Sequence, residues 1–311
     1  MKLLLILVMV AAVPAIFAQP NRDPNATKLV TSDIDLFWKA YDKATPENDL
    51  IVYRDEYLKK GSPGLQAFTK LRIGNSCNLV NAINGAPQYF RRLREPSLKI
   101  ASYEPRIRAS FKKMQDLYPD SVFPDVYFVI GRMTSGGTLT DNALYIGADM
   151  YGRNGDAPTD ELSNWLKAVV APMDRIPYIV AHELIHYQQK YSRSGDTTLL
   201  TRAIGEGSAD FIAELISGSH INTHLHEYGN PIEKELWLEF QREMNGKDVS
   251  NWMYQGDAAK TRPADLGYYM GYKIAESYYK NAPEKKQAVR DILEIKDVDQ
   301  FFKLSRYAEK F

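Results

Sequence analysis

The segment Tyr178–Lys190 carries His182, Glu183 and His186 in the pattern H-E-x-x-H, and this pattern constrains the fold more than any other feature of the chain. Residues four apart on an α-helix lie on one face, so both imidazoles can reach a single cation. Glu183 lies one residue further round, beside that cation. Neutral imidazoles suit Zn²⁺, and the adjacent carboxylate can take a proton from a water molecule at the metal. The alternative is a helix with two unrelated histidines.

The residues around the motif predict a helix independently of the histidines. Asp174 can act as its N-cap, Pro177 falls in its first turn, and Gly195 is a stop signal after it. A wide apolar face is formed by Ile179, Val180, Leu184, Ile185 and Tyr187. A buried helix with two imidazoles and a carboxylate needs compensation for their desolvation, and a metal ion is the simplest one.

A second helix is predicted at Thr201–Leu215, where Glu206 and Asp210 are four residues apart and share a face. Gly205 and Gly207 flank Glu206, although glycine inside a helix costs up to about 1 kcal/mol relative to alanine. The glycines indicate that another backbone comes very close, as a helix bringing a third ligand to the first would require. Asp210 is placed to accept the second ring N–H of a ligating histidine. The alternative is a solvated acidic stripe.

Together these segments resemble the gluzincin zinc metallopeptidases, in which H-E-x-x-H is followed by a helix bearing G-E-x-x-x-D. More narrowly, the chain resembles a bacterial family described as Zn-dependent proteases and related to gliding-motility lipoproteins. The resemblance covers about residues 126–279 and rests on Gly136–Thr138, His182–His186, Gly205–Asp210 and Asp265–Tyr272. It implies Glu206 as the third zinc ligand beside His182 and His186.

Two related patterns do not fit the chain. Gln189 and Ser192 occupy the Gly and His positions of the longer metzincin motif. Gly205 stands where thermolysin-type enzymes have an Asn before the ligand Glu, which puts that Asn's substrate contact in doubt but does not affect the metal.

Strands are predicted at Asp125–Ile130 and Thr138–Gly147 from their β-branched and aromatic residues. In gluzincins a strand at the sheet edge lies beside the zinc helix and binds extended substrate through main-chain hydrogen bonds. The resemblance assigns this substrate-binding role to Gly136, Gly137 and Thr138. The alternative is a hairpin that only completes the sheet.

Tyr268 and Tyr272 share one face of a helix predicted after Arg262. Amide hydrolysis passes through a tetrahedral oxyanion, and a hydroxyl aimed at this oxyanion lowers the barrier by a few kcal/mol. Some gluzincins supply such a Tyr downstream of the third ligand, so Tyr268 or Tyr272 can serve here as a catalytic residue. His224 or His226 is an alternative donor. Alternatively, both tyrosines pack in the hydrophobic core with their hydroxyl groups at the edge of the core.

The first residues predict export. Lys2 precedes an apolar stretch, Leu3–Val13, that is too short to span a bilayer, and Ala18 offers a cleavage site. We expect a signal peptide at residues 1–18, with an uncleaved anchor as the alternative. No Cys follows the apolar stretch, so no lipoprotein anchor is expected, and Cys77 alone allows no intramolecular disulfide. A bacterial periplasmic or secreted protein fits these features, with no transmembrane helix in the mature chain.

The expected fold is mainly helical α+β. Residues 19–121 predict an all-helical amino-terminal lobe, and residues 122–311 a zincin-like core with a small β-sheet beside the zinc helix and carboxy-terminal helices. The 39 Lys and Arg residues balance 39 Asp and Glu residues, so charge gives no support for a nucleic-acid partner.

We therefore predict an exported zinc metallopeptidase that acts on a peptide or protein substrate with Glu183 as general base. Two alternatives stay open. One is a zinc-binding structural or interaction protein of the cell envelope without turnover, and the other is a zinc hydrolase for a non-peptide bond.

Overall fold

The computed structural model describes residues 20–155, 159–192 and 197–311, so the predicted signal peptide at 1–18 lies outside the described residues. The described chain is mainly helical with a four-stranded sheet, which confirms the predicted α+β class. The helices before the sheet's central part are α1 (Ser32–Lys43), α2 (Asp49–Val52), α3 (Pro63–Phe68), α4 (Ser76–Gly85), α5 (Pro87–Ser97) and α6 (Glu104–Leu117). Those after it are α7 (Asn164–Val169), α8 (Ile176–Gln188), α9 (Leu199–Ser217), α10 (Thr223–Gly229), α11 (Glu233–Glu243), α12 (Leu266–Asn281), α13 (Lys285–Leu293) and α14 (Val298–Ser305).

The sheet has the strand order β1-β2-β4-β3, so β3 is an edge strand. Its strands are β1 (Leu29–Val30), β2 (Asp125–Val129), β3 (Gly137–Leu139) and β4 (Ala143–Gly147). β1, β2 and β4 are parallel, whereas β3 is antiparallel to β4. The single strand predicted at 138–147 is therefore a tight hairpin that turns at Thr140–Asn142, where the Thr140 N–H donates to the Ala143 carbonyl.

β1 corrects the expectation that residues 19–121 are all helical. It consists of two residues that pair with Val126 and Tyr127 of β2. Two residues are too few to show an alternating pattern, so the sequence alone gives no sign of this strand.

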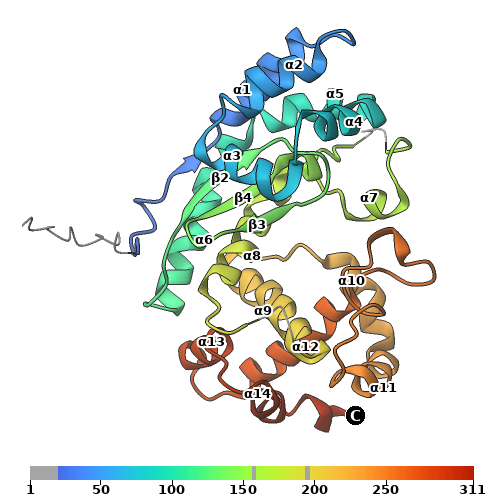
Figure 1. Ribbon diagram of the computed structural model, residues 1–311. Coiled ribbons are helices and arrows are strands. Elements are labelled where there is room, and N and C mark those ends of the chain that lie inside the picture. The colour runs from blue at the N-terminus through green and yellow to red at the C-terminus, as the bar shows by residue number, and fades with distance from the viewer. Residues whose placement is uncertain (1–19, 156–158, 193–196) are drawn as a thin grey trace, which may run out of the picture.

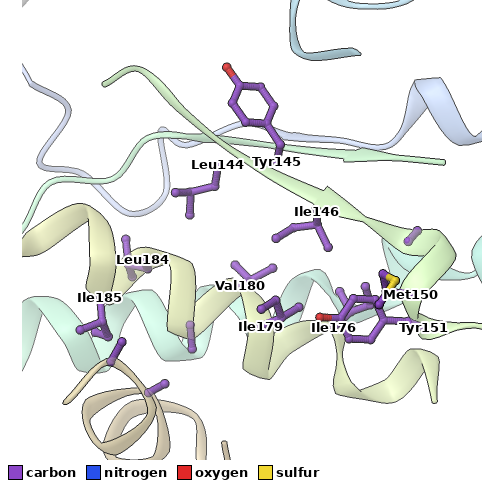
Figure 2. Packing of buried hydrophobic residues seen from close by; sticks show 14 of the residues in the cluster. Leu144, Tyr145, Ile146, Met150, Tyr151, Ile176, Ile179, Val180, Leu184 and Ile185 are labelled. Atoms are coloured by element: carbon purple, nitrogen blue, oxygen red, sulfur yellow. The ribbon is translucent and has the colours of Figure 1, made fainter. Parts of the chain in front are cut away.

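Helices cover both faces of the sheet (Figure 1). α1 and α3 pack on one face, and α8 packs on the other, against β3 and β4. Figure 2 shows Leu144 and Ile146 of β4 directed toward α8, where Val180 and Leu184 meet them, while Tyr145 points to the opposite face. Every residue of β4 is buried because both of its faces are covered.

α8 is buried almost all round, as expected of a central helix. It begins at Ile176 with Arg175 as its N-cap residue, and Asp174 lies in the preceding 3-10 turn (Met173–Arg175). The predicted N-cap role of Asp174 is therefore wrong. The helix ends at Gln188 because Gln189 has an extended backbone, and the predicted stop at Gly195 lies outside the described residues.

α9 packs closely on α12 through glycines on both helices. A Cβ atom at Gly207 of α9 would overlap the backbone of Gly271 and Tyr272, and a Cβ at Gly271 would overlap the Ala203 carbonyl. The backbone predicted to approach near Glu206 is thus that of α12, not that of α8. Gly207 and Gly271 thus hold one face of α9 against α12, while the Glu206 side chain is directed toward the histidines of α8.

α6 packs against both α8 and α9, so the amino-terminal segment contacts the helices that carry the motif. Within the described ranges, no helix combines the length and the apolar character needed to cross a bilayer.

Candidate metal centre

His182, His186 and Glu206 bring their ligand atoms together between α8 and α9, within 4.8 Å of one another. His186 Nε2 lies 2.9 Å from Glu206 Oε2, and His182 Nε2 lies 3.7 Å from the same oxygen. In the part of the chain that the structure describes, this is the only group of three His, Cys, Asp or Glu residues with such geometry. The predicted convergence of two imidazoles and a carboxylate from the next helix is present.

Asp210 fixes the orientation of His182. Its Oδ1 lies 2.8 Å from His182 Nδ1, and its Oδ2 accepts a hydrogen bond from Asn222 Nδ2 at 2.7 Å. A carboxylate beside an imidazole nitrogen accepts, so the Nδ1 atom carries a proton and donates. The Nε2 lone pair of His182 is then directed toward Glu206.

Gln189 does the same for His186, a role that the sequence did not indicate. The Gln189 Nε2 donates to the Gly205 carbonyl at 2.7 Å and to Ser208 Oγ at 3.0 Å. Because a carbonyl can only accept, the amide nitrogen faces Gly205 and the amide oxygen faces His186 Nδ1, 2.9 Å away. His186 Nδ1 therefore donates, and its Nε2 lone pair also points at Glu206.

Two imidazole lone pairs and a carboxylate oxygen are all acceptors, so a positive charge is needed between them. Protons can supply it: burial lowers the pKa of His182, but Asp210 and Glu206 outweigh burial and raise that pKa to about 10. Burial likewise raises the pKa of Glu206, but His186 and His182 hold it well below its usual range. A divalent cation would satisfy the same atoms, and two His with one Glu is a ligand set of catalytic zinc sites.

Glu183 lies beside the cluster and against the edge strand. A Cβ atom at Gly137 of β3 would overlap the Glu183 carboxylate, so the main chain of β3 directly contacts this side chain. This contact gives a steric reason for a glycine at position 137. Only a residue without a side chain allows the strand and the carboxylate to approach so closely.

A cavity of about 1020 Å³ opens onto the cluster. The three predicted ligands and Glu183 line it, as do all three predicted substrate-binding residues, Gly136, Gly137 and Thr138. The edge strand and the ligand cluster therefore share one space.

The two candidate tyrosines lie in different surroundings. Tyr268 lines the cavity, and its ring is nearly parallel to that of His182, with centroids 6.5 Å apart. Tyr272 is not among the lining residues, and its hydroxyl donates to Glu214 Oε2 at 2.5 Å. Tyr268 and Tyr272 lie on the same helical face, one turn apart. At Tyr272 the backbone of α12 packs directly on Gly207 of α9, so this residue does not line the cavity.

The histidines of the following segment also separate. His224 lines the cavity, and burial lowers its pKa. His226 instead packs between the rings of Tyr269 and Tyr272, with centroids 5.1 and 4.4 Å away. Of the two alternative donors, His224 is the one that faces the cluster's space.

Tyr254 is a cavity residue that the sequence did not reveal. Its hydroxyl lies 3.4 Å from Glu206 Oε1, and its φ of 59° is rare for a residue other than glycine. The segment 252–256 carries only a loop signal, and one Tyr among 20 gives no hint of this position.

The fold and the cluster define a mainly helical α+β protein with two buried histidines and a half-buried glutamate brought together beside a small sheet. The chain belongs to the family of the gliding motility protein GldB, whose model matches residues 88–309, more than two thirds of the sequence. This match confirms the predicted relation to gliding-motility lipoproteins, and a lipoprotein family is consistent with a location at the cell envelope. No curated protein and no solved structure matches the chain significantly.

Proposed function

We propose that this chain is a zinc-dependent peptidase of the gluzincin type, exported to the periplasm or secreted by way of the signal peptide predicted at 1–18. The observation that carries the proposal is the convergence of His182, His186 and Glu206 within 4.8 Å, with Glu183 in the same cavity. A cation would stabilise three acceptors that face one another, and two His with one Glu is a ligand set of catalytic zinc sites.

The residues of the chain have distinct tasks in the proposed reaction. His182, His186 and Glu206 hold the ion, while Asp210 and Gln189 keep both imidazoles in the tautomer that offers Nε2. When bound, Zn²⁺ acts as a Lewis acid and lowers the pKa of a coordinated water to about 7.

Glu183 accepts a proton from the attacking water and passes it to the nitrogen of the leaving amine. The Tyr268 hydroxyl donates to the carbonyl oxygen of the substrate as negative charge develops on it. Its position in the cavity beside His182 supports this role over the same role for Tyr272.

The edge strand supports a peptide as the substrate. β3 has β4 on one side only, so its other edge can pair with an extended chain through main-chain hydrogen bonds. The contact of Gly137 with Glu183 would bring such a chain directly to the general base.

Glu183→Gln tests the proposal, because it removes the base while keeping the size of the side chain. We expect purified wild-type protein to contain zinc and to cleave peptides in a chelator-sensitive way. The variant should retain zinc and lose roughly 100-fold or more in rate. Equal cleavage by both proteins would remove Glu183 from the mechanism.

The family match favours one second candidate, a zinc-binding component of the cell envelope without turnover, since the family is described by motility and not by an enzymatic activity. Tight zinc binding together with no cleavage of casein or of a broad peptide library by the wild-type protein would favour this candidate.

A further inference from the structure

We propose that the cavity selects peptides that carry a carboxylate, either an Asp or Glu side chain or a free carboxyl terminus, and that Arg175 binds this group. The inference rests on the proposed peptidase function and names its substrate class.

Arg175 lies at the start of α8, is half-buried and lines the cavity. Its guanidinium is held by neutral groups: Nη1 lies 3.3 Å from Ser219 Oγ, Nη2 lies 3.4 Å from Thr223 Oγ1, and the group packs over the Tyr178 ring at 5.2 Å. These contacts orient the guanidinium, and none of the three partners carries a charge.

Two other arginines with low or moderate exposure are paired with a carboxylate. Arg94 pairs with Asp42 and Arg262 with Glu239, each at 2.6–2.8 Å, whereas no carboxylate of the described residues forms an ion pair with Arg175. A guanidinium has five N–H donors, and the two neutral contacts are long. A partly buried cation with free donors favours an anion, and its planar fork matches a carboxylate in particular.

Two further arginines line the same cavity. Arg72 Nη2 donates to Thr138 Oγ1 of β3 at 2.8 Å, and Arg153 Nη1 donates to the Lys167 carbonyl at 3.2 Å. Both acceptors are neutral, and in the described ranges neither arginine forms an ion pair with a carboxylate. Three acidic residues, Glu183, Glu206 and Asp265, also line the cavity, and in the described residues none of them forms an ion pair with these arginines.

The position of Arg175 limits where the carboxylate lies on the substrate. His182 follows Arg175 by seven residues, which is about 10 Å along the helix axis. An extended peptide advances about 3.3 Å per residue, so the carboxylate belongs within roughly three residues of the cleaved bond. Ile179 lines the wall between them and can pack against the methylene groups of a Glu side chain.

Binding measured without cleavage tests the inference. Zinc-loaded Glu183→Gln protein would be titrated with fluorescent peptides that carry Glu or Gln at each of three positions on either side of a fixed bond, monitored by anisotropy. A second pair compares a free carboxyl terminus with its amide. These two arms distinguish a side-chain carboxylate from a terminal one.

We expect at least one acidic peptide to bind roughly tenfold or more tightly than its neutral counterpart. Adding Arg175→Gln should abolish the preference, and Arg175→Lys should restore part of it because the charge returns without the fork. Both variants should keep their zinc, which shows that the centre is intact.

Arg106→Gln is the matched control, since Arg106 also packs on the Tyr178 ring, at 5.1 Å, but is exposed and does not line the cavity. It should leave the preference unchanged. Equal affinity for acidic and neutral peptides, binding of neither, or a preference that survives Arg175→Gln would overturn the inference. A wild-type protein that cleaves peptides without this preference refutes only the inference, whereas an Arg175-dependent preference without any cleavage refutes only the peptidase proposal.

Discussion

The main chain of Gly137 on β3 lies directly against the carboxylate of Glu183 on α8, with no room for a Cβ atom between them. This contact joins the edge of the sheet to the side chain that we propose as the general base. The strand that would align a peptide also determines where the carboxylate can lie. Substitutions at residue 137 therefore test the catalytic proposal without touching a metal ligand.

Gly137→Ala is expected to displace the Glu183 carboxylate and to lower kcat/KM for peptide hydrolysis by roughly 100-fold, because small displacements of a catalytic group are costly. Zinc content should not change. Gly85→Ala is the control, since a Cβ at Gly85 meets no atom within 4 Å. If Gly137→Ala cleaves peptides as fast as the wild type, the strand does not constrain the base.

Asp210→Asn is expected to weaken zinc binding by roughly 10- to 100-fold, because the carboxylate that orients His182 is lost. The affinity can be measured by competition with a chromophoric chelator. Glu214→Gln, one turn further along α9, removes the same charge away from the cluster and should leave the affinity unchanged. Equal weakening by both variants would point to a general effect on α9.

Tyr268→Phe and Tyr272→Phe form a matched pair on one helix. Removal of the Tyr268 hydroxyl should lower kcat by about 10²–10³-fold with a smaller effect on KM, because the donor acts mainly in the transition state. Tyr272→Phe should keep kcat and lower the free energy of unfolding by about 1 kcal/mol, through loss of the hydrogen bond to Glu214. Steady-state kinetics and urea denaturation check both; the opposite pattern in kcat would assign the oxyanion role to Tyr272.

Asp149 is expected to make stability depend on pH. Burial raises its pKa to about 6, although the N–H groups of Gly131 and Met133 donate to its carboxylate. In the unfolded chain this group ionises near its ordinary pKa of 3.8. The contribution of Asp149 to the free energy of unfolding is therefore greatest below pH 4, where Asp149 is protonated in both states, and it falls as pH rises through 6.

The difference between the two pKa values corresponds to about 3 kcal/mol. This contribution can be measured by urea denaturation of the wild type and of Asp149→Asn between pH 4 and pH 7. Subtracting the unfolding free energy of one protein from that of the other at each pH cancels the pH effects that both share. The wild type should lose about this amount relative to the variant as pH rises. A difference that does not vary with pH would contradict the buried charge.

The ligand cluster could be predicted from sequence because it depends on local geometry. A spacing of four residues places His182 and His186 on one face of any helix, and it does the same for Glu206 and Asp210. The resemblance then supplied the pairing of the two helices. The strand at 125–129 was similarly local, since its composition alone favours a sheet.

Sequence by itself thus determined which side chains share a helical face and that the segments carrying the motif are helical. Tertiary structure alone decided what each face meets. Gly207 packs on α12 and not on α8, Tyr268 rather than Tyr272 faces the cavity, and the contributions of Gln189 and Tyr254 come from segments without any pattern. The physical reason is that helical periodicity is set by hydrogen bonds between residues four apart, whereas the partner of a helix face is chosen by packing between residues that are distant in the chain.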